Sequence, residues 1–323
     1  MGIDRREFLK RMAAGAAALT LGSLLDAQEK EEPEHKPPKK FADAEVWVAE
    51  GFKTPQDAVK AAVDAAGFLK TLPVRSKRVV LKPNIAFNRR PDEGACTHPD
   101  VVAATVLIFK KAGAKEVLVL DRAVANPHHT YRTSGIKEAV ERAGGKLLFP
   151  DWKGELFFVE RRIPNAVTLK KWTFLKEALG ADILVNLPVA KHHALAVLTC
   201  AVKNWLGVVG GRRGRLHPHI HQNLVDIARL IKPAFVIADC WRMLFRRGPQ
   251  GRSKDDLIHP KIIVVGRNMF TVDAYVVTLF AKHSPNWRSR KPHNIGYLKL
   301  GFEQGLGETR PEKIKVHKVS PRR

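Results

Sequence analysis

The stretch ADILVNLPVAKHHALAVLTCAVKNWLGVVGGRRGRLHPHIHQN, residues 181–223, contains the pattern that decides the fold. It begins with a short apolar run, residues 183–185, which ends at the polar break formed by Asn186 and Pro188. A continuous run of this length predicts a strand that is buried on both faces of a sheet. Because basic and histidine residues follow at once, we expect the carboxyl end of this strand to open into a ligand site.

Similar apolar runs alternate with helix-like segments along the chain. The expected strands are residues 46–49, 78–81, 116–120, 146–149, 183–185, 235–238 and 262–265, and the expected helices are residues 57–70, 98–112 (with Thr97 as N-cap), 135–143 and 271–280. This alternation predicts an α/β fold with a mainly parallel, multi-stranded sheet and helices on both faces. The alternating aromatic pattern of residues 151–171 predicts a small antiparallel insertion.

Polar residues follow the predicted strands at the point where each strand ends. They are Lys82, Asn84, Asp121, Asn186, Lys191 and Asp239. Each of these residues, taken alone, could have a purely structural role, such as capping a turn. In open α/β sheets, however, ligands bind beyond the carboxyl ends of the strands, so the joint placement predicts a shared cleft.

The lysines and arginines of this cleft favour an anionic ligand. Lys203 lies between the apolar pairs 201–202 and 205–206, where an ammonium group is costly unless it meets an anion. The loop GGRRGR, residues 210–215, adds arginines and close backbone donors. The candidate ligand-binding residues are Lys82, Asn84, His98, Lys191, Lys203, Asn204, Arg212 and Arg213.

The cleft could instead bind a divalent metal ion, because histidines and aspartates are both present in it. His193 and His219 are candidates for proton transfer, and the same two residues with Asp239 form the candidate metal ligands. Pro218 resembles a first-turn proline, so His217 and His221, rather than all three alternate histidines, would share a side of the helix.

The first residues predict export. Residues 1–27 contain Arg5 and Arg6 before a short apolar segment, a pattern that resembles a twin-arginine signal. Residues 28–40 are charged and proline-rich and predict a disordered linker, so a single α/β domain is expected at residues 41–323. The expected partner is the twin-arginine export machinery, and the expected location is periplasmic or otherwise extracytoplasmic. Membrane contact is expected only through an uncleaved signal segment.

The net charge, the distribution of basic residues and the number of cysteines limit which binding partners and cofactors are expected. The formal net charge of +24 requires an anionic partner or a strongly solvated surface. The basic residues are scattered as pairs and no nucleic-acid-binding signature is present, so nucleic acid is not the expected partner. Cys96, Cys200 and Cys240 are far apart and too few to hold an iron–sulfur cluster within this chain.

A series of short motifs resembles the domain-of-unknown-function family 362 (DUF362). In order they are K-P-N (82–84), T-H-P (97–99), L-P-V-A-K-H-H (187–193), K-N-W-L-G (203–207), His219, Asp239, G-P-Q-G (248–251), V-D-A (272–274) and G-L-G (305–307). The family pattern usually has K-T-H where this chain has Lys191, His192 and His193. Some members carry a ferredoxin-like segment, whose cysteines this chain lacks. The resemblance implies no established reaction.

Three classes of function follow from these residues. The first is an exported enzyme that acts on a phosphate- or carboxylate-bearing ligand, with or without a metal. The second is a ligand-binding protein that uses the same cleft without catalysis. The third is an accessory redox protein that docks a separate iron–sulfur carrier through its basic surface.

Overall fold

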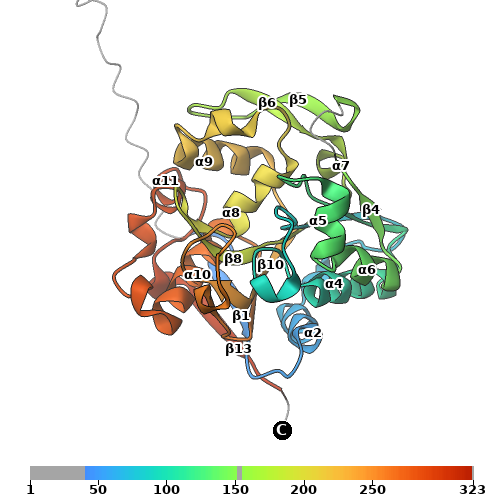
Figure 1. Cartoon of the computed structure of the whole chain (residues 1–323), viewed down its shortest axis with the longest axis horizontal. Helices are drawn as coiled ribbons and strands as arrows, with labels where there is room; N and C mark the ends of the chain where they lie inside the picture. The colour runs from blue at the N-terminus through green and yellow to red at the C-terminus, as the bar shows by residue number, and fades with distance from the viewer. Residues whose placement is uncertain (1–40, 151–154, 322–323) are drawn as a thin grey trace, which may run out of the picture. The chain divides into compact units, whose positions relative to one another are not determined.

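The computed structural model describes residues 41–150 and 155–321, and an 11-stranded sheet dominates this part of the chain (Figure 1). Its main order is β13-β1-β12-β10-β7-β2-β3-β4, with β8, β9 and β11 attached through β10. The strands are β1 (Glu45–Ala49), β2 (Arg78–Pro83), β3 (Glu116–Leu120), β4 (Lys146–Leu148), β7 (Ile183–Leu187), β8 (Val189–His193), β9 (Val197–Thr199), β10 (Phe235–Leu244), β11 (Leu257–Ile258), β12 (Ile262–Gly266) and β13 (Lys315–Val319).

Most strand pairs in this sheet are parallel, as predicted. Val80 at the centre of β2 pairs with Leu118 of β3 on one side and with Leu184 of β7 on the other. The exceptions include β12, which runs antiparallel to both β1 and β10. The parallel pairing of β2, β3 and β7 brings their carboxyl ends to the same edge, which is where the polar residues predicted for the site lie.

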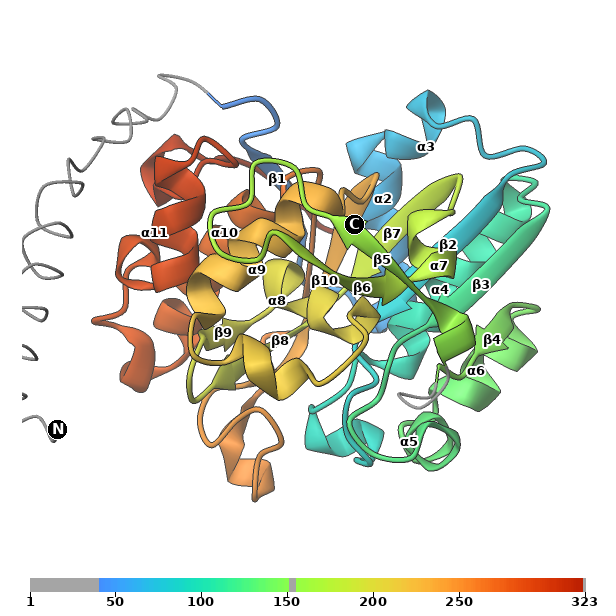
Figure 2. The ribbon, with the colours of Figure 1, turned by 90° about the horizontal axis from the view of Figure 1, so that it is seen from above.

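Helices cover both faces of the sheet because side chains alternate along each strand. Val79 of β2 belongs to one hydrophobic core and Val80 to the other. The first core includes α2 (Pro55–Ala66), α3 (Phe68–Thr71), α4 (Pro99–Lys111) and α6 (Ile136–Arg142), and the second includes α8 (Ala201–Asn204), α9 (Ile220–Leu230), α10 (Met269–His283) and α11 (Gly296–Glu303). Figures 1 and 2 show these two sets of helices on opposite sides of the sheet.

Two details predicted for helix N-termini, the Thr97 cap and the first-turn position of Pro218, are wrong. His98, not Thr97, caps α4, and its Nδ1 accepts the Asp100 N–H at 3.1 Å. The Thr97 hydroxyl instead donates to the Leu187 carbonyl at 2.7 Å, which ties the loop to β7. Pro218 does not lie in the first turn of α9, which begins at Ile220.

A small antiparallel element is present, as predicted, in a two-stranded sheet of β5 (Phe158–Arg162) and β6 (Lys171–Leu175), but it extends past the predicted end at residue 171. Asp226 of α9 accepts the Val167 and Leu169 N–H groups at 3.0 and 2.8 Å, which fixes the loop between the two strands. The predicted signal and linker, and the first residues of the predicted insertion, lie outside the described residues. The remaining helices are α5 (Pro127–Thr133) and α7 (Lys176–Leu179).

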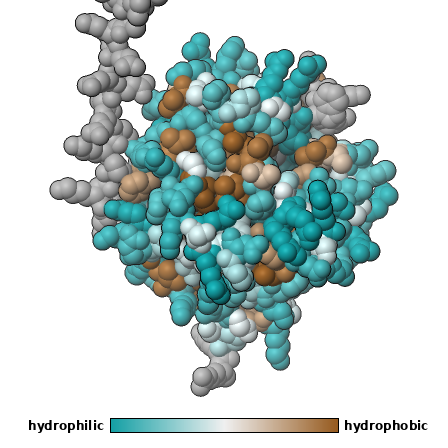
Figure 3. Space-filling model, turned by 60° about the vertical axis from the view of Figure 1, so that its left-hand side comes forward, coloured by the Kyte–Doolittle hydropathy of each residue, from teal (hydrophilic) through white to brown (hydrophobic). Residues whose placement is uncertain are grey.

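The visible surface is mostly polar. Figure 3 shows hydrophilic residues over most of one face, with small apolar patches between them. Across the residues that the structure describes, no helix has the length and apolar character needed to cross a bilayer.

Candidate functional site

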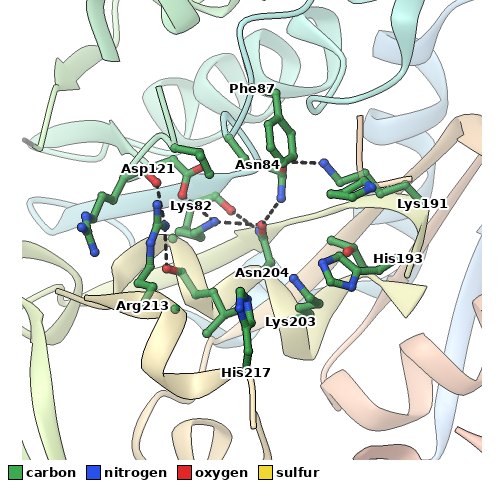
Figure 4. Close-up of a pocket in the computed structure, with 18 residues that line it drawn as sticks. Lys82, Asn84, Phe87, Asp121, Lys191, His193, Lys203, Asn204, Arg213 and His217 are labelled. Atoms are coloured by element: carbon green, nitrogen blue, oxygen red, sulfur yellow. Dashed lines mark hydrogen bonds and ion pairs between the residues drawn. The ribbon is translucent and has the colours of Figure 1, made fainter. Parts of the chain in front are cut away.

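A pocket of about 410 Å³ lies at the carboxyl ends of β2 and β3, under the loop of residues 207–217. Its wall includes residues from β2, β8 and α8, together with the loops that follow β2 and β3 (Figure 4). The rule that places ligands beyond the strand ends of an α/β sheet therefore predicts its position correctly.

A buried ion pair forms the floor of the pocket. Lys82 at the end of β2 and Asp121 just after β3 are both buried, and Nζ lies 2.8 Å from Oδ1. Burial lowers the pKa of Lys82, while the charge of Asp121 opposes this shift. Gly207 packs against the pair so closely that a Cβ at this position would lie 1.7 Å from Asp121 Oδ1. The glycine is therefore required by the packing.

Asn204 connects the neighbouring strands β2 and β7, and the residue that follows β2, through its side-chain amide. Its Oδ1 accepts hydrogen bonds from Lys82 Nζ at 2.8 Å and from Asn84 Nδ2 at 3.1 Å. Its Nδ2 donates to the Lys82 carbonyl at 3.0 Å and to Asn186 Oδ1 at 2.8 Å. The amide therefore makes all four of its hydrogen bonds, and Asn204 holds the floor of the pocket in place.

Lys191 of β8 carries a positive charge that lacks a carboxylate partner within the described residues. Its ammonium donates to Asn84 Oδ1 at 3.1 Å and to the Ala95 carbonyl, and it lies 4.8 Å from the centre of the Phe87 ring. Burial lowers its pKa to about 8. These neutral partners orient the ammonium, but they do not compensate its charge.

Lys203 differs from the other pocket lysines because it has no hydrogen-bond or ion-pair partner in residues 41–150 and 155–321. It projects from α8, whose first N–H groups, those of Ala201 and Val202, are held by the Asp273 carboxylate at 2.6 and 3.1 Å. Burial first, and then the charges of Lys191 and Arg213, lower the pKa of Lys203 to about 7.

Two arginines brace the loop after β3 against the glycine–arginine loop. Arg122 donates to the Val209 and Gly211 carbonyls at 2.7 and 3.0 Å. Arg213 donates in the other direction, to the carbonyls of Arg122, Leu206 and Ala123 at 3.0 to 3.1 Å. Both side chains line the pocket, so their charges contribute to its field even though main-chain oxygens bind them.

His193 at the end of β8 is held in one tautomer. Its Nδ1 accepts the N–H groups of Leu195 and Ala196, both at 3.1 Å. Burial, together with the nearby Lys203 and Lys191, lowers the pKa of His193 to about 3. The neutral ring must then carry its proton on Nε2, which makes His193 a hydrogen-bond donor to the pocket.

The structure brings most, but not all, of the predicted site residues together. The predicted residues that line the pocket are Lys82, Asn84, Lys191, His193, Lys203, Asn204 and Arg213. The predicted residues that lie elsewhere are His98, Arg212, His219 and Asp239. Arg212 lines a separate groove beside Trp172, and His219 is the exposed N-cap of α9.

The predicted metal ligands His193, His219 and Asp239 do not converge. Asp239 is buried in β10, where its carboxylate accepts the His98 N–H at 2.7 Å and the Trp241 N–H at 2.9 Å. It also lies 3.7 Å from Arg242. In the described ranges, no group of three or more His, Cys, Asp or Glu residues is arranged to hold a metal ion. Asp239 is therefore a loop anchor in this structure, and the predicted three-residue ligand set is wrong.

Asp121, which was expected in the cleft but not named as a ligand-binding residue, lines the pocket. His217 and Phe87 also line the pocket and were not predicted as site residues. Nothing in the alternating histidines distinguishes His217 from His219 before the backbone of the loop is known, and Phe87 has no signal in the sequence.

Comparison with known proteins agrees with the motif resemblance. The model of the family described as "Domain of unknown function (DUF362)" matches residues 79–278, which include all the residues that line the pocket. The chain belongs to the DUF362 family. Residues of this DUF362 member are also 28% identical, over 170 residues, to the thylakoid-associated protein sll1697 of a Synechocystis strain. This match covers 50% of the chain and 51% of that protein, so the chain spans about half the length of its curated relative.

Two solved structures share parts of the fold at low identity. The lactate racemase apoprotein of Thermoanaerobacterium thermosaccharolyticum is 13% identical with a TM-score of 0.41, covering 71% of this chain and 58% of that one. A protein from Thermotoga maritima is 11% identical with a TM-score of 0.44, covering 72% of this chain and 60% of that one.

Proposed function

We propose that this DUF362 protein is an enzyme that acts on a small anionic substrate, bound in the pocket through a carboxylate or phosphate group. The observation that carries the proposal is the charge of the lining. Among the described residues, four cationic side chains face one carboxylate there: Lys82, Lys191, Lys203 and Arg213 against Asp121. The Asp121 carboxylate is already paired with Lys82. An anion of one or two charges would therefore find an uncompensated partner in Lys191, whose side chain is itself buried.

Two features favour catalysis over binding alone. A site that only binds an anion needs charged lysines, whereas Lys203 has a pKa near neutrality and can exchange a proton at physiological pH. His193 supplies a fixed hydrogen-bond donor beside it, as Figure 4 shows. An acid–base reaction needs a group that can gain and lose a proton, which Lys203 supplies, and a hydrogen-bond donor, which His193 supplies. The alternative proposal, a ligand-binding protein without turnover, uses the same pocket and requires only its charges.

We also propose that the protein is exported by the twin-arginine pathway. The proposal rests on Arg5 and Arg6 and on the short apolar segment that follows them.

Isothermal titration calorimetry of the full chain with inorganic phosphate and with succinate tests the anion site. We expect Lys203→Met to weaken binding about 10- to 100-fold, because a hydrogen bond to a charged group contributes about 1.5–3 kcal/mol. The matched control is Lys111→Met, which removes the same charge from the exposed end of α4. No measurable binding of any small anion, or equal affinity in all three proteins, would overturn the proposal.

A further inference from the structure

The three pocket lysines have three different environments. Lys82 is paired with Asp121 at 2.8 Å, so its ammonium form is held by a carboxylate. Lys191 is bound by two oxygens and lies over the Phe87 ring. Lys203 has none of these interactions within the described part of the chain. It is therefore the pocket amine whose proton is easiest to remove and whose nitrogen is not already committed to another group.

The surroundings of Lys203 favour the neutral amine. The charges that act on it come from Lys191 of β8, Arg213 of the glycine–arginine loop and Lys82 of β2, and all three are positive. Burial adds to their effect. An amine of pKa near 7 is about half unprotonated at pH 7, whereas an ordinary lysine has only about 0.04% of its molecules in that form. Burial and neighbouring cations are the conditions under which proteins use lysine as a nucleophile.

His193 is placed to assist at the atom that such a nucleophile attacks. Both Lys203 and His193 line the pocket, and they lie next to each other in Figure 4. Because two backbone N–H groups occupy Nδ1 of His193, its Nε2–H remains to donate to a ligand. A carbonyl oxygen is a suitable acceptor, and a hydrogen bond to it polarises the carbonyl carbon toward attack.

We propose that Lys203 forms an imine with a small carbonyl compound that also carries a carboxylate or phosphate, such as a 2-oxo acid. This inference rests on the proposed anion site, because Lys191 and Arg213 hold the anionic group while Lys203 meets the carbonyl carbon. His193 is the donor to the carbonyl oxygen. The pocket, at about 410 Å³, holds a molecule of this class.

The step balances without any further reactant. The lone pair of neutral Lys203 Nζ attacks the carbonyl carbon, a C–N bond forms as the C=O π bond breaks, and the oxygen takes up the proton that the nitrogen releases, which gives a neutral carbinolamine. Loss of water from that species leaves the neutral imine, and uptake of one proton from solvent gives the protonated imine. One amine and one carbonyl thus give one imine and one water, with no oxidation or reduction. The imine then withdraws electrons from the adjacent carbon, which is the chemical use of such an intermediate.

Reductive trapping tests the proposal on the full chain. The protein is incubated at pH 7 with pyruvate and sodium cyanoborohydride, digested, and mapped by mass spectrometry for N-carboxyethyl lysine. We expect Lys203 to be labelled at least about tenfold faster than the exposed Lys111, because its fraction of free amine is larger. Acetone, a carbonyl of similar size without the carboxylate, should label Lys203 more slowly than pyruvate, and phosphate should compete with pyruvate.

The outcomes separate this inference from the function on which it rests. Labelling of Lys203 no faster than that of Lys111 would overturn the imine, while phosphate binding by calorimetry would leave the anion site standing. Rapid labelling of Lys203 by acetone and pyruvate alike, without competition by phosphate, would retain the nucleophile and overturn the anion site. Because the sites are mapped in the wild-type chain, the result does not depend on the folding of any variant.

Discussion

The Lys82 ammonium lies 2.8 Å from Asp121 Oδ1 and joins the carboxyl ends of the neighbouring parallel strands β2 and β3. Asp121 Oδ2 also accepts the Ile85 N–H, so one carboxylate fixes both loops that follow these strands. The pair is buried. The ion pair therefore stabilises the arrangement of the two loops that form the floor of the pocket.

Removal of one partner of the Lys82–Asp121 ion pair should destabilise the folded protein. Asp121→Asn leaves the buried Lys82 without a countercharge, and we expect it to lower the free energy of unfolding by about 3–5 kcal/mol, measured by urea denaturation. The double variant Lys82→Met, Asp121→Asn removes both charges and should recover part of that loss. A single variant as stable as the wild type would contradict a structural ion pair.

Lys203 should make stability depend on pH. Because its pKa falls from 10.5 to about 7 on folding, the unfolded chain binds more protons between these values, so stability should rise with pH from about 7 to 10.5. Lys203→Met retains the apolar stem and removes the titration. We expect the wild type to gain stability relative to this variant between pH 6 and pH 9.5, in denaturant titrations without ligand. The opposite trend would mean that Lys203 has a folded-state anion partner of its own.

Asp239 should affect stability without affecting the pocket. Asp239→Asn weakens the acceptor of the His98 and Trp241 N–H groups and leaves Arg242 without its nearby carboxylate. We expect a loss of about 1–3 kcal/mol in unfolding free energy. The affinity for phosphate should change less than about twofold, a difference of roughly 0.4 kcal/mol. A large loss of phosphate affinity in a variant that stays folded would place Asp239 in the functional site after all.

Export should depend on Arg5 and Arg6. Replacement of both by lysine keeps their charge, and we expect it to block export because the twin-arginine pathway reads the arginine pair itself. Cell fractionation of the two forms measures the result. As a matched control, Arg161→Lys, Arg162→Lys changes another arginine pair in the same way. Equal export of the Arg5 and Arg6 variant and the wild type would refute the signal assignment.

The fold and the position of the pocket could be predicted from the sequence because both depend on local pattern. Apolar runs locate the strands, and a parallel sheet brings their ends to one edge regardless of the loops between them. Lys82, Asn84 and Lys191 follow such runs, and all three line the pocket. Lys203 was predictable on a second ground, since an ammonium among apolar neighbours needs a polar destination.

The residues placed wrongly depend on loop geometry or on long-range register. The backbone of the glycine–arginine loop directs Arg213 into the pocket and Arg212 away from it, although the two are adjacent. The same loop continues to Leu216 as a short 3₁₀ turn, so His217 lies at the pocket and His219 outside it. Asp239 ends the apolar run of β10 as predicted, but the strand continues to Leu244, so Asp239 lies inside the sheet. None of these outcomes has a local sequence signal.

The central claim is that the pocket is built to bind an anion, and an anomalous scattering experiment tests it most directly. Crystals of the full chain are soaked in sodium selenate, and an anomalous difference map is calculated at the selenium edge. The charges of Lys191, Lys203 and Arg213 predict a selenate within hydrogen-bond distance of at least one of them. Anomalous peaks confined to surface arginines such as Arg212, with none inside the pocket, would contradict the account.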